Sequence, residues 1–454
     1  MYGKLYTFFS TKIVFIIVLC IFELGSIICA AAPNSTTLIV GRAIAGLGAG
    51  GMFPGATLIL VYSAPLERRP ALLGIVTGMS AVASLAGPFV GGVFADRVTW
   101  RWCFIINVPL GVIAVIVVFF FVKTPVDPSY RTWSTMKKFS QARLPEMLVV
   151  AASLVCLILA LQWGGAIYPW SDGRVIALLV VFAVLLVLFI SSQLYFSSAR
   201  AVPDSILRQR SIWSAAVFAI CMAGAMFISV TYLPIYFQAI KGSSALSSGI
   251  NVMPLILGFL VMTTLSGVIT NITGYCNISL IICPILSSIG AGLITTFAVD
   301  TPSREWIGYQ ALLGFGVGFG LQQPLIVAQS VLEEKDVPLG IALMTLSQML
   351  GGAVFVAVAQ NVFQNDLVKG VVAAIPGFNA SKLLNEGATS FSTLFTPEQI
   401  QVVLPVYSNV IDSVFRIVTG LCAASVIGAL ATEWRSTKKN VSSSAAKIEN
   451  ATAH

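Results

Sequence analysis

Charged residues are scarce in this sequence. They make up 10% of its 454 residues, against about 25% in an average soluble domain, whereas apolar residues make up 57% and the mean hydropathy is +0.92. A water-soluble fold of this size would have too few charges to cover its surface, so the composition argues against a soluble enzyme. Runs of roughly 20 apolar residues instead predict an all-α, polytopic membrane protein.

Histidine is almost absent, because the only one is the last residue, His454. This excludes catalysis or metal binding by buried histidine. The eight cysteines show no paired spacing and no CxxC, so neither a disulfide framework nor a zinc site is predicted. The net charge of +8 is explained by basic residues that orient membrane helices, so we expect no nucleic-acid partner. We also expect no metal and no cofactor.

Apolar runs bounded by Pro, Gly and charge predict twelve membrane spans. With the N-terminus inside, 17 of the 26 basic residues fall in inner segments and 7 in outer ones, with two inside spans. The excess predicts that both termini are cytoplasmic, most simply in the plasma membrane. The predicted spans are 13–32, 38–62, 71–95, 103–122, 144–163, 174–196, 212–238, 247–270, 277–297, 307–331, 339–363 and 406–432.

The connections divide the chain into four parts. We expect a four-span bundle at 1–122, basic inner loops with two linker spans at 123–211, a six-span bundle at 212–432 and a disordered cytoplasmic tail at 433–454. The outer stretch 364–405 is less apolar and contains Pro376, Pro397 and Pro405. It also carries the sequon Asn379-Ala380-Ser381, which predicts a glycosylated Asn379.

Charged residues inside spans are costly and usually face a protein interior or an aqueous path. Arg42 either serves such a path or snorkels outward, and Glu23, near the middle of the first span, can meet it across the turn at Pro33-Asn34. A buried pair of this kind is structural or, if the carboxylate titrates, carries protons. In the last span Asp412 and Arg416 lie four residues apart and are expected to neutralise each other.

Uncharged polar residues in spans form interhelical hydrogen bonds or line a binding cavity. The group Gln322-Gln323-Pro324 is the best cavity candidate, because proline frees backbone carbonyls. The formal GxGxxG from Gly46 to Gly51 lies in an apolar helix without a preceding strand, so it indicates helix packing and not a nucleotide site. The other polar candidates are Gln162, Asn251, Gln329, Gln348 and Gln360.

Several motifs resemble those of the fourteen-span drug:proton antiporters of the major facilitator superfamily. Gly87-Pro88-x-x-Gly91-Gly92 is similar to the antiporter motif, and Arg42 matches the arginine of the proton-linked motif. Trp100-Arg101-Trp102 through Asn107-x-Pro109-x-Gly111 resembles a hallmark of this branch, and Tyr232 to Gln238 is also typical. The likeness is strongest to fungal efflux pumps for toxins and other secondary metabolites.

The resemblance implies two helical bundles that rock about a midplane site. It implies a monomeric, non-enzymatic secondary transporter in the lipid bilayer that exports small amphipathic molecules, such as drugs or toxins, in exchange for protons. Arg42 and Glu23 would couple protons, and Gly87, Pro88, Gly91 and Gly92 would set helix packing. The cavity residues would be Tyr232, Tyr236, Gln238, Asn251, Gln322, Gln323 and Gln348.

Departures from the family pattern leave alternatives open. Ala83 stands where the antiporter motif usually has glycine, and Thr7 occupies the usual aspartate position of a degenerate first-loop motif from Gly3 to Lys12. That motif belongs between the second and third family helices, so we expect that the first two spans are missing. The alternatives are a proton-coupled importer, such as a siderophore transporter, or a non-transporting truncated product.

Overall fold

A computed structural model describes residues 2–63, 90–94, 97–122, 144–165, 167–195, 208–332, 336–375 and 395–435, with single positions at 79, 83, 87 and 206. Eleven helical segments in this part of the chain are long and apolar enough to cross a membrane. Each overlaps a predicted span, which confirms the all-α membrane class. The one other predicted span, 71–95, falls mostly outside the described residues, as do Asn379 and the tail beyond residue 435.

The chain divides into two compact units, which are described separately. The first comprises residues 1–150 and 192–201. Its described helices are α1 (Tyr2–Phe8), α2 (Thr11–Ala30), α3 (Ser35–Ser63), α5 (Trp102–Ile105) and α6 (Asn107–Phe121), together with the start of α9.

Helices α2 and α3 pack closely because small residues line their contact. A Cβ on Gly25 would stand 2.6 Å from the Cα of Ala45, and one on Gly48 would stand 2.5 Å from the backbone nitrogen of Phe22. Gly41 packs in the same way against Cys29. Gly46 has open space around it, so only one side of the glycine-rich run faces α2. These contacts support the prediction of helix packing for this run.

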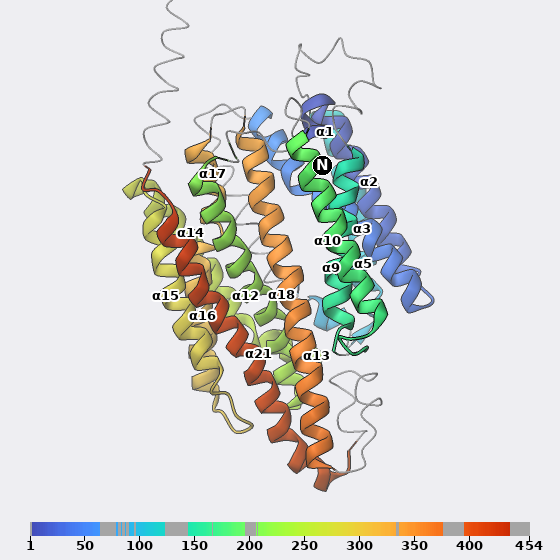
Figure 1. Cartoon of the computed structure of the whole chain (residues 1–454), viewed down its shortest axis with the longest axis vertical. Helices are drawn as coiled ribbons and strands as arrows, with labels where there is room; N and C mark the ends of the chain where they lie inside the picture. Colours follow the sequence, from blue (N-terminus) through green and yellow to red (C-terminus); the bar gives the residue numbers. More distant parts are fainter. Residues whose placement is uncertain are drawn as a thin grey trace, which may run out of the picture. The chain divides into compact units, whose positions relative to one another are not determined.

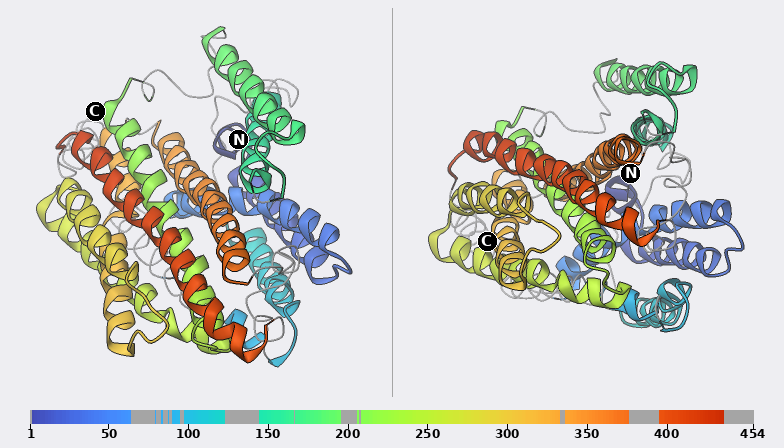
Figure 2. Two further views of the ribbon diagram at one scale, coloured as in Figure 1. Left: turned by 60° about the horizontal axis from the view of Figure 1, so that its bottom comes forward. Right: turned by 90° about the horizontal axis from the view of Figure 1, so that it is seen from below.

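The second unit comprises residues 151–191 and 202–454. In it α21 lies alongside α12, α15 and α18, and α16 packs against α14 and α15 (Figures 1 and 2). Its described helices are most of α9 (Leu144–Trp163), α10 (Gly173–Tyr195), α12 (Arg210–Ala239), α13 (Ala245–Asn251), α14 (Met253–Thr273), α15 (Asn277–Ile294), α16 (Ser303–Gly320), α17 (Gln323–Val331), α18 (Val337–Ala374) and α21 (Pro397–Ala431).

Two helices extend beyond their predicted ends into the polar stretch 364–405. Helix α18 continues to Ala374, and α21 begins at Pro397. Proline is well suited to the first helical position, since the N–H that it lacks would have no partner there. The side chains of Thr396 and Gln399 cap this start reciprocally. Pro397 therefore marks a helix start, and the predicted outer stretch is shorter than its composition indicated.

Candidate functional site

The structure does not bring Arg42 and Glu23 together. Arg42 is exposed, and its guanidinium carbon lies 5.9 Å from the ring centroid of Phe104 on α5. The Glu23 carboxylate lies against Gly111 on α6. Its Oε2 is buried and has no hydrogen-bond partner among the described residues. Both charged groups thus turn to the segment α5–α6 and not to each other.

The hallmark motif on α5 and α6 ties this segment to α2. Arg101 donates a hydrogen bond of 2.9 Å to the carbonyl of Ala32, just after the end of α2, and stacks 4.6 Å from the ring of Trp100. Asn107 donates to the hydroxyl of Ser26 at 3.4 Å. A cation at a helix C-terminus is also favoured by the helix dipole. The motif therefore holds in place the segment α5–α6, against which Glu23 and Arg42 lie.

The antiporter motif is only partly described. Gly87, Gly91 and Gly92 are helical, and Pro88 lies outside the described residues. No described atom comes within 4 Å of the place where a Cβ would stand on Gly87 or Gly91. Their role in helix packing stays a prediction.

In the second unit, the tenth predicted span is broken at Gln322-Gln323-Pro324, the group at which proline was expected to free backbone carbonyls. Helix α16 ends at Gly320 and α17 begins at Gln323. Pro324 explains the break, because its ring clashes with the carbonyl four residues earlier and it donates no hydrogen bond. Broken helices are tolerated at membrane depth only where other groups satisfy the freed backbone.

Side chains from α14 and α18 satisfy carbonyls at this break. Thr263 donates to the carbonyl of Gly318 at 3.2 Å and Ser266 to that of Phe319 at 2.6 Å. Gln348 donates from α18 to the carbonyl of Leu321 at 2.7 Å. The break is therefore a polar junction of three spans.

Gln323 completes this junction with its side-chain amide. Its Nε2 donates to the hydroxyl of Ser266 at 2.6 Å, and its Oε1 accepts from Thr270 at 3.3 Å. Gln323 is 2% exposed, and Gln322, the residue just before α17, is half-buried. Gln323 and Gln348 thus form interhelical hydrogen bonds, the first of the two alternatives for such residues. A role in a substrate cavity stays a prediction for all three glutamines.

Aromatic side chains gather where α12, α15, α18 and α21 approach one another at the other end of this bundle. One chain of ring contacts connects Tyr232, Phe363 and Tyr407, with centroids 5.4 and 5.5 Å apart. A second joins Tyr236 to Phe297 at 5.0 Å. The two predicted tyrosines are buried in this cluster.

The segment between α15 and α16 is held by side chains from α12 and its end. The hydroxyl of Tyr236 donates to the carbonyl of Ala298 at 2.9 Å. The ammonium of Lys241 donates to the carbonyls of Val299 and Thr301 at 2.7 and 2.9 Å. Burial lowers the pKa of Lys241, and the negative charge of Asp300 opposes that shift. We call these three hydrogen bonds the α15–α16 latch.

The last two residues predicted for the substrate cavity, Gln238 and Asn251, lie near this latch in sequence. Gln238 donates to the hydroxyl of Ser248 at 2.9 Å, which joins the end of α12 to α13. Asn251 is half-buried at the end of α13.

Three residues of this unit, Ser279, Gln310 and Asp412, have buried side-chain polar atoms without a hydrogen-bond partner in the described structure. Gln310, on α16, is fully buried, and neither its amide nitrogen nor its amide oxygen has a hydrogen-bond partner. Sequence reasoning missed it, although a glutamine in an apolar span was a signal. The Oδ1 of Asp412 is buried without a hydrogen-bond partner; the charge of Arg416 acts on this carboxylate, but the two side chains form no direct ion pair among the described residues. Among the described residues no cluster of acids, cysteines or histidines could hold a metal ion.

Comparison with known proteins agrees with this architecture. The family model of the Major Facilitator Superfamily matches residues 1–356. The chain belongs to this superfamily. Membership makes it a multi-pass membrane transporter and not an enzyme, and it confirms the family that the motifs resemble.

Its relatives include named fungal efflux pumps. The chain is 63% identical to the thioclapurine efflux transporter tcpA of Claviceps purpurea, over 96% of this chain and 81% of that protein. It is 47% identical to the efflux pump MFS1 of Trichophyton rubrum, over 96% of this chain and 82% of that protein, and 43% identical to the efflux pump aflT of Aspergillus parasiticus, over 97% and 86%.

A solved structure shares the fold. A bacterial homolog of the human lysosomal transporter Spinster, inward-facing and unoccupied, superposes with a TM-score of 0.58 at 12% identity, covering 94% of this chain and 85% of that one. At this identity the likeness supports the fold alone.

Proposed function

We propose that this major facilitator protein exports small amphipathic organic molecules in exchange for protons. The observation that carries the export direction is the 63% identity to a thioclapurine efflux transporter over nearly the whole chain. The efflux pumps at 43–47% identity support the same direction. The substrate class would be secondary metabolites or drugs of similar amphipathic character.

Proton coupling is supported by groups in the first unit. A carboxylate buried within a span is a natural proton carrier, because it can be neutral in an apolar setting and charged when water reaches it. Glu23 fits this role, since its Oε2 is buried without a partner. Arg42 would stabilise the deprotonated, negatively charged form of Glu23 from its position over Phe104 on α5.

The substrate would bind in the second unit between the polar junction and the aromatic cluster at the other end of the bundle. Gln322, Gln323 and Gln348 are at the helix break, and Tyr232, Tyr236, Gln238 and Asn251 are at or near the α12 end. Discontinuous helices near the bilayer midplane are a frequent location of transporter sites. The antiporter motif at Gly87, Pro88, Gly91 and Gly92 would govern the packing needed for exchange.

The remaining features of the proposal concern placement in the cell. The basic-residue count supports cytoplasmic termini and an outer Asn379. We further propose that the membrane is the plasma membrane and that Asn379 is glycosylated at its sequon. We also propose a monomer, with bundles at 1–122 and 212–432 separated by the linker region 123–211 and followed by a tail at 433–454.

The direct test uses the protein in sealed vesicles with an imposed pH gradient and an amphipathic fluorescent compound. Export coupled to protons predicts that the compound accumulates on the proton-rich side and that a protonophore abolishes the accumulation. Vesicles that contain the Arg42→Gln protein should accumulate the compound about tenfold more slowly. Accumulation on the opposite side would show import, and accumulation unaffected by the protonophore would reject antiport.

A further inference from the structure

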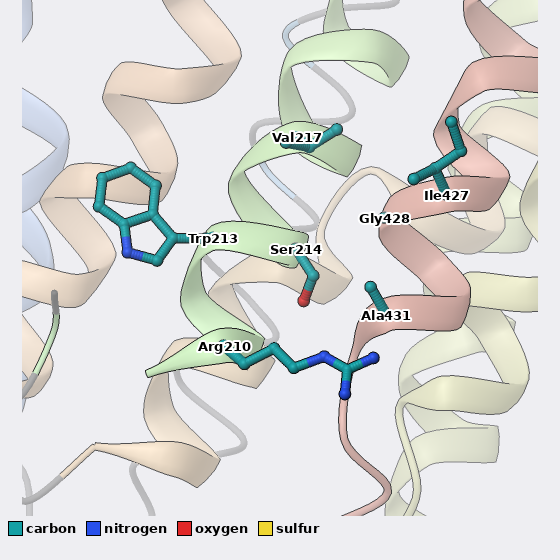
Figure 3. Close-up of a pocket in the computed structure, with 7 residues that line it drawn as sticks. All are labelled: Arg210, Trp213, Ser214, Val217, Ile427, Gly428 and Ala431. Atoms are coloured by element: carbon teal, nitrogen blue, oxygen red, sulfur yellow. The ribbon is translucent and has the colours of Figure 1, made fainter. Parts of the chain in front are cut away.

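A groove lies between the start of α12 and the end of α21 (Figure 3). It has a volume of about 250 Å³ and is apolar along most of its length. Arg210 lies at one end of it, beside Ala431, and its side chain extends across toward α21. The other residues that line the groove are Trp213, Ser214, Val217, Ile427 and Gly428.

The position of this groove along its two helices places it at the membrane surface. Arg210 is the first residue of a 30-residue apolar span, and Ala431 is the last residue of another. Trp213 and Trp434 lie at the same ends, as tryptophans at a membrane interface do. The groove therefore opens where lipid headgroups meet the acyl region.

The apolar part of the groove is open to the surrounding lipid. Ile427 is 70% exposed, Trp213 47% and Val217 45%. Exposed apolar side chains in a membrane span contact acyl chains. A chain entering between α12 and α21 would therefore meet apolar walls on both sides.

The cationic end is held in place and is not neutralised. Among the described residues no carboxylate forms an ion pair with Arg210, and the nearby acid, Glu433, pairs with Arg435 at 3.2 Å. Ser214 and Thr432 share a hydrogen bond of 3.0 Å, and the backbone N–H of Glu433 donates to Ser211 at 3.3 Å. These bonds fix α12 against α21 at the level of Arg210.

We propose that this groove binds an anionic phospholipid. The phosphate would pair with the Arg210 guanidinium, which suits phosphate oxygens through its fork of N–H donors. One acyl chain would lie along Val217 and Ile427, and the Trp213 ring would border the glycerol region. The charge of Arg210 and the apolar groove leading away from it match the two halves of such a lipid.

The test uses fluorescence quenching by brominated lipids in reconstituted vesicles. Brominated phosphatidylglycerol and brominated phosphatidylcholine are compared at equal mole fraction in a phosphatidylcholine host. The contribution of Trp213 is the difference between the wild-type protein and Trp213→Phe. One unpaired arginine near the surface should enrich the anionic lipid about fivefold at Trp213.

Variants of two neighbouring arginines separate this site from general attraction. Arg210→Gln should remove the excess quenching, Arg210→Lys should keep part of it, and Arg208→Gln, which changes an exposed arginine outside the groove, should leave it intact. Equal quenching by the two lipids in the wild-type protein would overturn the proposal, as would equal losses from Arg208→Gln and Arg210→Gln. Because both lipids are compared with the same pair of proteins, wild type and Trp213→Phe, this comparison does not depend on whether the arginine variants fold.

Discussion

The carboxylate of Glu23 occupies the space where a Cβ of residue 111 would stand, and residue 111 is a glycine. The relationship gives the last position of the hallmark motif a physical purpose. Any side chain there would displace the buried carboxylate of α2. It also links the motif on α6 to the residue proposed to carry protons.

The first prediction is a coupling between these two positions. Gly111→Ala should lower the free energy of unfolding by about 1 kcal/mol, since the methyl group clashes with the carboxylate. In a Glu23→Ala background the same change should be neutral or stabilising, because alanine favours helix over glycine by up to about 1 kcal/mol. Thermal unfolding in detergent of the wild-type protein, the two single variants and the double variant completes this double-mutant cycle. An equal loss in both backgrounds would show that the clash is with another group.

The second prediction concerns Arg42. Because the side chain is exposed in the first unit, Arg42→Gln should leave protein abundance unchanged. Gradient-driven export should fall about tenfold, which corresponds to raising the activation free energy of the rate-limiting step by about 1.4 kcal/mol. Arg174→Gln is the matched control, since Arg174 is also exposed at a span and stacks on Tyr168 at 4.8 Å. Equal export by both variants would remove Arg42 from the mechanism.

The third prediction tests the polar junction at the helix break. Ser266→Ala removes a donor to the carbonyl of Phe319 and an acceptor for Gln323, so it should cost about 1–2 kcal/mol. Thr264→Ala is the control on the same helix, because its hydroxyl bonds only the carbonyl of Leu260 one turn earlier. The melting temperature should fall for the first variant and barely change for the second. The reverse order would mean that the junction contributes little to stability.

The sequence pattern predicted the spans well but not which way their polar residues face. On α2, Phe22 and Gly25 form the face that contacts α3. Glu23 is one residue further and therefore turned by about 100° from Phe22, toward α6. When nearly all residues of a helix are apolar, the sequence does not show which side of the helix faces which neighbouring helix. The contact considered between Glu23 and Arg42 is therefore absent, although both helices lie in the predicted spans.

Motifs with a strong local cause were more predictable than those that depend on distant partners. Pro324 predicted freed carbonyls, and the helix does break beside it. The donors that meet those carbonyls come from α14 and α18, about 25 to 60 residues away, and no spacing rule points to them. The start of α21 also has a local cause, the capping box of Thr396 and Gln399 with Pro397 at the first helical position, but the sequence analysis left Pro397 in the outer stretch.

The fourth prediction concerns pH and the α15–α16 latch. The folded state lowers the pKa of Lys241, so between that value and the ordinary lysine pKa it binds fewer protons than the unfolded state. The free energy of unfolding should therefore rise with pH across that alkaline window. Lys241→Met should abolish this slope and, by removing two hydrogen bonds, lower stability at every pH. Thermal unfolding measured between about pH 8 and about pH 10 is the readout; an unchanged slope in the variant would assign it to another group.

The last prediction compares two buried glutamines of the second unit, Gln310 and Gln323. Both are at most 2% exposed, but the amide of Gln323 is hydrogen-bonded whereas that of Gln310 has no partner in the described structure. A buried amide without a partner costs about 1–3 kcal/mol, and an apolar residue of similar shape removes that cost. Gln310→Leu should therefore raise the melting temperature, while Gln323→Leu should lower it, since it leaves the hydroxyl of Ser266 without its donor. If Gln310→Leu is destabilising as well, a partner such as a bound water must satisfy the Gln310 amide, and the prediction that this amide has no hydrogen-bond partner would be wrong.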